Sequence, residues 1–259
     1  MSISITTKLA TVTTAFFLST GITEKTSAAD NVMVPLPQEL EIKLALSALP
    51  TSLREEATIL VLDQHTGYKT YRKGKNGFTT FVGRTSTRFY QADWEYKYPA
   101  DQLIPVAFDK VGAAAHMLPW MDIARMRAQG MPAAEAKKHL REAFENGTYK
   151  APNKGGISYM LAPIHRAYMA PEKNDKVFTV SFPHYMPYAP HVTGRHLGSF
   201  DPSKGMPIAL THGMHEAGPH GYLVFKLPDE QIRAIQLENT GLLEELCKLH
   251  SNWCIDNGG

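Results

Sequence analysis

The sequence has only two cysteines, no excess of charge of one sign, and no apolar segment long enough to cross a bilayer. Cys247 and Cys254 are the only cysteines among 259 residues, so at most one intramolecular disulfide can form. Lysine and arginine number 27 and aspartate and glutamate number 25, which gives a formal net charge of +2. Binding to nucleic acid or to an anionic membrane needs clustered basic charge, so this balance indicates neither partner.

The first 29 residues have the layout of a secretory signal peptide. Lys8 precedes an apolar, threonine-rich run at 9–22, and the small residues Ser27 and Ala29 stand before the expected cleavage point. The run is too short to span a bilayer, which needs about 20 predominantly apolar residues. We therefore expect cleavage after Ala29, export to the periplasm or the extracellular space, and a mature chain without an integral membrane segment. A disordered tail is the alternative interpretation.

The two cysteines also admit two interpretations. In an oxidising compartment a disulfide is favoured, but a continuous helix would place the Cα atoms of Cys247 and Cys254 about 10 Å apart, beyond the reach of the bond. The helix must therefore end before Cys254, and residues 251–253 (SNW) are expected to end it. His250 leaves a zinc site as the alternative, although no fourth ligand stands nearby.

Residues 30–259 predict a single globular domain of the α+β class, with a small antiparallel sheet, a helical insertion and a C-terminal helix. The β-like runs and turn signals at 57–63, 68–74 and 76–84 predict an antiparallel meander. Further β-like runs lie at 157–163, 177–182, 206–212 and 221–228.

The helical insertion is expected at 105–130 and 131–147, and the C-terminal helix at 229–250. Pro119 interrupts the first stretch, while Gly147 supplies the position after the end of the second. We expect Asp229 to cap the C-terminal helix and Gly241 to bend it.

Three segments resemble a family of exported bacterial proteins. They are GYKTYRKGKNGFTTFVGR (67–84), residues 118–163, and FPHYMPYAPHVT (182–193). The family's shared features are a β-hairpin ending in an NGF turn, an Ala/Glu-rich helix, a G-I-x-Y-M-L strand and a P-H-x-M-x-Y-A-P loop. The resemblance covers roughly 48–227 and implies export and a single domain. The family has no established activity, so it supplies no mechanism.

Some residues match the family pattern and others depart from it. His184 and Tyr188 match the loop motif, and His220 falls where a late histidine precedes the last strand. The family's cysteines in the hairpin and before the helix are replaced here by Thr80 and Ala107, so any family disulfide is in doubt.

Histidine is concentrated in one region of the chain. Six of the eleven histidines lie between residues 184 and 220: His184, His191, His196, His212, His215 and His220. A transition-metal site needs neutral imidazoles about 2 Å from one ion. We predict His184, His212, His215 and His220 as candidate ligands of a divalent transition metal such as zinc, with His184 and His220 approaching one another. Glu216 would be a further ligand or act on a bound water.

The alternative is that these histidines are structural or exposed. Prolines at 183, 187, 190, 207 and 219 favour loops over both histidine-rich runs, and loops face solvent by default. An H-x-x-H pair is also weaker evidence for a metal than the helical H-E-x-x-H motif. The nearby aromatic residues Tyr185 and Tyr188 are candidates for binding a small-molecule ligand, or they cap the core.

Two functions follow from this pattern. The first is an exported, non-catalytic protein that binds a ligand or a metal through 182–220. The second is a metal-assisted hydrolase that uses the same histidines. No serine lies in a G-x-S-x-G turn, so nucleophilic catalysis has less support.

Overall fold

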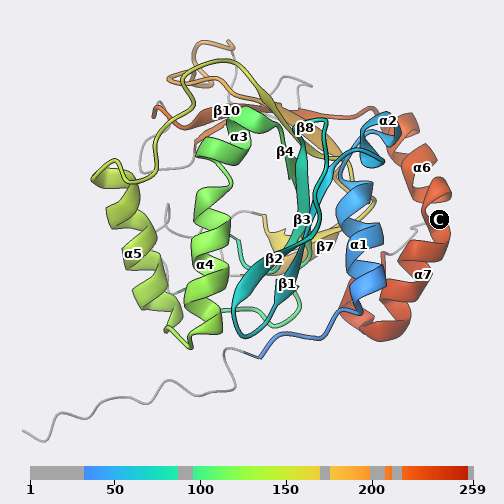
Figure 1. The fold of residues 1–259 in the computed structure, drawn as a ribbon. Coiled ribbons are helices and arrows are strands. Elements are labelled where there is room, and N and C mark those ends of the chain that lie inside the picture. Colours follow the sequence, from blue (N-terminus) through green and yellow to red (C-terminus); the bar gives the residue numbers. More distant parts are fainter. Residues whose placement is uncertain (1–31, 87–95, 170–175, 199–207, 212–217, 256–259) are drawn as a thin grey trace, which may run out of the picture.

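The computed structural model describes residues 32–86, 96–169, 176–198, 208–211 and 218–255 (Figure 1). The expected signal peptide at 1–29 lies outside these ranges and stays a prediction. Within them the α+β class is confirmed, with seven α-helices, an eight-stranded sheet and a separate two-stranded sheet. None of the described helices combines the length and the apolar character needed to cross a membrane.

The main sheet is larger than the sequence predicts, and it is mixed rather than antiparallel. Its strand order is β2-β1-β3-β4-β5-β8-β10-β9. The bounds of these strands are β1 Thr58–Asp63, β2 Gly67–Arg72, β3 Thr79–Gly83, β4 Ile104–Phe108, β5 Ile157–Met160, β8 His184–Pro187, β9 Ile208–Thr211 and β10 Gly221–Lys226. The remaining strands, β6 (His165–Tyr168) and β7 (Val177–Val180), pair with each other.

The predicted meander is wrong because β3 pairs with β1 in parallel. β1 and β2 form the expected hairpin. The chain then passes the start of β1, where the Gly74 amide donates to the Thr58 hydroxyl over 3.0 Å. A Cβ atom on Gly74 would lie 2.1 Å from the Glu56 carbonyl oxygen, so only glycine permits this close crossing. The crossing delivers β3 to the far side of β1.

The predicted helix at 105–130 is wrong over its first residues, which form β4. All five residues of β4 are buried, and a fully apolar run of this length cannot be assigned to a helix or a strand by its periodicity. Helix α3 (Lys110–Ala115) begins after Asp109, whose carboxylate accepts from the Gly112 amide. The interruption near Pro119 is confirmed, because α4 (Leu118–Ala128) starts there.

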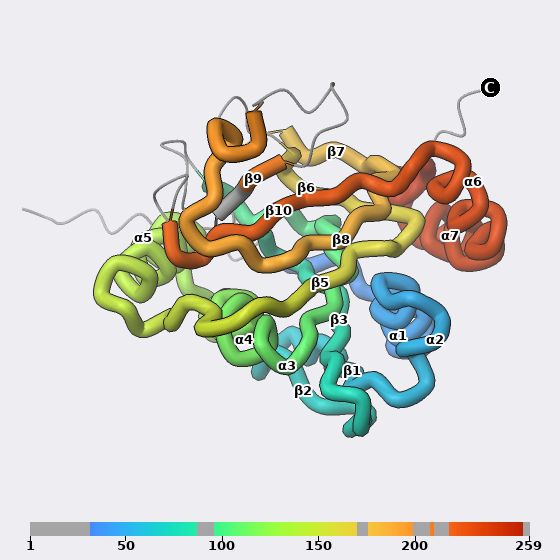
Figure 2. Tube along the Cα trace, turned by 90° about the horizontal axis from the view of Figure 1, so that it is seen from above, coloured from blue at the N-terminus to red at the C-terminus, as the bar shows by residue number. Residues whose placement is uncertain are grey.

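Two layers of helices enclose the main sheet (Figures 1 and 2). One layer holds α3, α4 and α5 (Ala133–Glu145). The other layer holds α1 (Gln38–Ser47), α2 (Thr51–Arg54), α6 (Asp229–Glu238) and α7 (Thr240–Leu249). Successive side chains of each strand therefore pack against different helices: Phe81 joins the cluster of Trp120, whereas Val82 joins that of Leu44 and Trp253.

The predictions for α5 and for the cysteines are confirmed. Gly147 follows the end of α5 with φ of 75°, the left-handed conformation that glycine adopts at helix ends. Cys247 and Cys254 form a disulfide with Cα atoms 4.4 Å apart. This is possible because α7 ends at Leu249 and a short 3₁₀ helix, Ser251–Trp253, turns the chain back.

The predicted C-terminal helix is divided into α6 and α7 at Asn239, two residues before the expected bend at Gly241. Asp229 is not the cap of α6. Its carboxylate instead accepts from the Lys226 ammonium group over 2.8 Å, and the residue before the helix is Pro228, which fixes the backbone angle at the helix start.

The proline-rich run that begins at residue 182 also differs from its prediction, because His184–Pro187 is strand β8 inside the main sheet. The prolines lie at positions that tolerate them. Pro187 has no N–H to donate. The pairing of β8 with β10 is interrupted at this residue, which lies between the pair Tyr185↔Phe225 and the isolated bridge Tyr188↔Tyr222.

Candidate functional site

The predicted ligand-binding tyrosines lie on different faces of the main sheet. Tyr185 and Tyr188 are an odd number of residues apart on an extended chain, so their side chains point in opposite directions. Tyr185 stacks on Phe225, with ring centroids 5.3 Å apart, whereas Tyr188 is buried in the cluster of Tyr222 and Met186. The two tyrosines therefore do not line one cleft.

The prediction that His184 and His220 approach one another is wrong. In the β8–β10 ladder His184 pairs with Lys226, six residues beyond His220. With a rise of about 3.3 Å per residue, the two histidines lie roughly 20 Å apart along the sheet. Two nitrogen ligands of one ion are at most about 4.5 Å apart, so this pair cannot share a metal. The sequence reasoning failed because it treated both residues as loop residues.

The other two predicted ligands, His212 and His215, lie outside the described residues, as does Glu216. In the part of the chain that the structure describes, no three histidine, cysteine, aspartate or glutamate side chains are grouped as metal ligands. The four-histidine site is therefore not formed as predicted, and the role of His212 and His215 stays a prediction.

The structure instead brings His220 together with a histidine that the sequence analysis did not single out. His116 follows α3, and its ring centroid lies 6.1 Å from that of His220. Tyr188 and Tyr222 complete the group, with ring centroids 4.6 Å and 6.2 Å from that of His116. We call His116, Tyr188, His220 and Tyr222 the histidine cluster; all four side chains are buried.

Aspartate and glycine hold Tyr188 in place. Its hydroxyl group donates to Asp109 Oδ1 over 3.3 Å, while Asp109 Oδ2 accepts from the Ile157 amide over 2.9 Å. A Cβ atom on Gly112 would lie 1.8 Å from the Tyr188 hydroxyl oxygen, and one on Gly156 would lie 2.7 Å from the ring. The ring thus occupies a slot that exists because two glycines have no side chain.

Burial keeps the imidazoles of the cluster neutral. Loss of hydration, with a smaller contribution from repulsion by a protonated His220, lowers the pKa of His116 to about 3. Burial also lowers the pKa of His220, while the Tyr149 carbonyl, which accepts from this ring, opposes the shift. Burial and the neighbouring Asp109 carboxylate raise the pKa of Tyr188, so its hydroxyl stays protonated.

A second buried histidine pair lies elsewhere. The ring centroids of His165 and His184 are 5.7 Å apart, and His184 Nδ1 lies 2.6 Å from the Phe182 carbonyl oxygen. This contact agrees with the alternative that His184 is structural. Burial, with a smaller contribution from His184, lowers the pKa of His165 to about 3.

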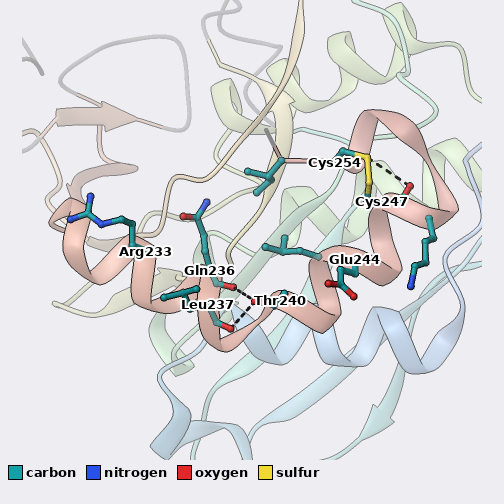
Figure 3. A pocket seen from close by; sticks show the side chains of 10 residues that line it. Arg233, Gln236, Leu237, Thr240, Glu244, Cys247 and Cys254 are labelled. Carbon is teal, nitrogen blue, oxygen red and sulfur yellow. Dashed lines mark hydrogen bonds between the residues drawn. A yellow bond between two sulfur atoms is a disulfide. The ribbon is translucent and has the colours of Figure 1, made fainter. Parts of the chain in front are cut away.

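An open groove of about 790 Å³ lies on the other side of the sheet, between α6, α7 and the chain after α7 (Figure 3). The Cys247–Cys254 disulfide lines it together with Leu237, Thr240 and Glu244. Of the described residues, neither the predicted ligands Tyr185, Tyr188, His184 and His220 nor His116 lines this groove, so it is separate from the histidine cluster.

Comparison of the chain with protein-family models, with curated proteins and with solved structures found no match. The candidate site therefore depends on its geometry alone. His116 was missed because a single histidine between an alanine-rich helix and a proline is most simply a core residue, and only the fold brings it to His220.

Proposed function

We propose that the protein is an exported, non-catalytic binding protein in which His116 and His220 bind one divalent transition-metal ion such as zinc. The observation that carries the proposal is the pairing of two buried imidazoles from distant parts of the chain. Neutral imidazole is the form that binds a metal, and the environment of His116 favours that form down to a pH of about 3.

The separation of the rings is close to that of two imidazoles on one ion. A zinc–nitrogen distance of about 2 Å places each ring centroid roughly 3.2 Å from the metal, so tetrahedral coordination puts two ring centroids about 5.2 Å apart. The centroids of His116 and His220 are 6.1 Å apart, so binding requires the rings to approach by about 1 Å.

The hydrogen bonding of His220 leaves one nitrogen available. His220 Nδ1 has no partner among the described residues, and the influence of the Tyr149 carbonyl on this ring leads us to propose that the carbonyl accepts from Nε2. A neutral imidazole donates from one nitrogen and carries a lone pair on the other. Metal-bound histidines usually make this kind of bond to a carbonyl, which fixes the tautomer and aims the lone pair.

The chain order suggests the remaining ligands. The last pair of the β9–β10 ladder is Thr211↔Gly221, adjacent to His220. The next residue in the sequence after Thr211 is His212, and His215 and Glu216 follow. These are the residues that the sequence predicted as ligands, and we propose that they complete the coordination begun by His116 and His220.

Zinc binding by the purified protein and four single variants tests this function. We expect one zinc ion per chain in equilibrium dialysis, and a loss of affinity of at least about 100-fold in His116→Ala and His220→Ala, since loss of an outer hydrogen-bond partner alone costs about 10–100-fold. His165→Ala controls for removal of a buried imidazole and His196→Ala for an exposed one; both should bind like the wild type.

Equal affinities in all five proteins would contradict the proposal. Metal-assisted hydrolysis remains the alternative function of the same residues. X-ray absorption of the zinc complex separates the two, because a site saturated by protein ligands supports binding, whereas a zinc-bound water together with ester or phosphoester turnover would favour the hydrolase.

A further inference from the structure

Two arginines are buried in the interior away from the histidine cluster. Arg84 follows β3 and Arg127 lies in the last turn of α4, and the residues are only 4% and 2% exposed. Arg84 donates to the carbonyl oxygens of Gln102 and Val34, each over 2.7 Å. Arginine cannot lose its proton inside a protein, so both guanidinium groups bring a permanent positive charge into the core.

No carboxylate forms an ion pair with either arginine in the described part of the chain. Arg127 donates to the Arg84 carbonyl and to the Thr85 hydroxyl, each over 3.0 Å. Two buried carboxylates influence Arg84 without pairing with it: Glu41 accepts from the Leu62 amide over 2.8 Å, and Asp101 pairs with Arg166 over 2.8 Å. Burial raises the pKa of Glu41 to about 7, so at neutral pH it offsets at most part of one of the two positive charges.

A small cavity of about 10 Å³ is lined by both arginines. Nine residues line it: Met33, Leu62, Tyr68, Arg84, Thr85, Trp120, Ile123, Ala124 and Arg127. Two N–H donors of these lining residues, Arg127 Nε and Trp120 Nε1, are buried and have no hydrogen-bond partner among the described residues. Such donors are rare in proteins, because each costs about 1–3 kcal/mol when it is left unpaired.

We propose that this cavity is a binding site for a small monovalent anion of the size of chloride. An anion there would accept from both unpartnered donors, and it would lie beside two guanidinium groups whose charge the fold does not neutralise. We call Arg84, Trp120 and Arg127 the arginine cluster. The remaining lining is mostly apolar, which disfavours exchange of the anion with bulk solvent.

The size of the cavity sets the class of ligand. About 10–15 Å³ is the space of one water-sized sphere, which suits a single-atom anion and is too small for sulfate, phosphate or a carboxylate. A water molecule would fit equally well, but it would accept the two hydrogen bonds without balancing charge. The competing ligand is therefore water, and an experiment must distinguish the two by charge or by electron count.

Anomalous diffraction from crystals of the full chain in sodium bromide makes this distinction directly. We expect a bromide peak within hydrogen-bond distance of both Arg127 Nε and Trp120 Nε1. Bromide peaks on the protein surface only, with none in the cavity, would overturn the proposal, because they would assign the cavity to water.

A measurement in solution uses the Trp120 donor. Replacing gluconate by chloride at constant ionic strength should raise the thermal midpoint of the wild-type protein by a few degrees, since a ligand that binds only the folded state stabilises it. Trp120→Phe keeps the ring but removes the N–H, and it should abolish this shift. Tyr149→Phe loses a buried hydroxyl group that donates to Asp122 over 2.8 Å, away from the cavity, and should keep it.

An equal chloride shift in Trp120→Phe and Tyr149→Phe, or no shift in the wild type, would count against an anion at this position. If Trp120→Phe does not fold, the wild-type bromide experiment still decides the question.

Discussion

The histidine cluster and the arginine cluster show two ways in which one fold accommodates buried bases. Helix α4 links them, because His116 lies two residues before its first residue, Leu118, and Arg127 lies in its last turn. Imidazole loses its charge when it is buried, so the histidine cluster needs no counter-ion and keeps lone pairs that a cation can use. Guanidinium stays charged, so the arginine cluster needs acceptors for its donors and an anion for its charge.

The difference also separates the roles of the two regions. The arginine cluster joins segments that are distant in sequence, because Arg84 donates to the carbonyl oxygens of both Val34 and Gln102. We therefore expect changes in the arginine cluster to act mainly on folding, and changes in the histidine cluster to act mainly on binding.

Removing a buried guanidinium should have the largest effect on stability. Arg127→Met leaves the Arg84 carbonyl and the Thr85 hydroxyl without this donor, and because each unpaired buried group costs about 1–3 kcal/mol, we expect a loss of about 2–6 kcal/mol in urea unfolding. The matched control is Arg125→Met on the same helix. Arg125 pairs with Asp122 in an ion pair whose side chains are 53% and 37% exposed, and such pairs contribute about 0–1 kcal/mol. Similar losses in both variants would contradict the comparison.

Acid should destabilise the metal-free protein through its buried histidines. The folded pKa of His116 and His165 is about 3, below the ordinary value of 6.5, so their contribution is complete above pH 6.5 and is lost as the pH falls toward 3. Each histidine contributes about 1.4 kcal/mol per pH unit in that interval.

Glu41 acts in the opposite direction. Its folded pKa of about 7 lies above its ordinary value of 4.5, so falling pH stabilises the fold until about pH 4.5. The two histidines and Glu41 together predict a net loss of about 3 kcal/mol between pH 6.5 and 4.5, with a steeper loss below. His116→Asn should reduce this slope, which urea unfolding at several pH values measures; an unchanged slope would show that His116 is not buried in its neutral form.

A smaller effect is expected where glycine makes room for Tyr188. Gly112→Ala places a methyl group on the Tyr188 hydroxyl and within 2.9 Å of Phe108, and overpacking of this kind costs about 1–3 kcal/mol. Gly155→Ala, where an added Cβ meets nothing within 4 Å, should change the stability by less than about 0.5 kcal/mol. If Gly112→Ala were equally neutral, Tyr188 would not be held in the slot described.

Local signals in the sequence predicted the parts of the fold that depend on nearby residues. Helix α5 has its apolar stripe and Gly147, and the disulfide needs only the end of a helix between two cysteines. The errors involve pairings over long distances. The sequence of β4 resembles a helix because both faces of this strand are buried, which removes the alternating pattern of a strand. β8 was predicted as a loop because the sequence does not show that Pro187 lies where the pairing of β8 with β10 is interrupted.

The candidate site divides in the same way. His220 could be found from its position before a strand, but its partner could not. His116 lies 104 positions earlier in the chain (220 − 116), and only the packing of α3 on the main sheet brings the two rings together. His184 was wrongly grouped with His220 because residues close in sequence were expected to be close in space.

The central claim is that His116 and His220 form a neutral pair that binds one metal ion, and the ¹⁵N resonances of their imidazoles test it most directly. At pH 7 without metal we expect both rings to be neutral, and at pH 5 His116 should still be neutral because burial lowers its pKa to about 3. One equivalent of zinc should then shift His220 Nδ1 and one nitrogen of His116, while the resonances of His165 stay in place. Protonation of His116 at pH 5, or unchanged resonances at saturating zinc, would contradict the account.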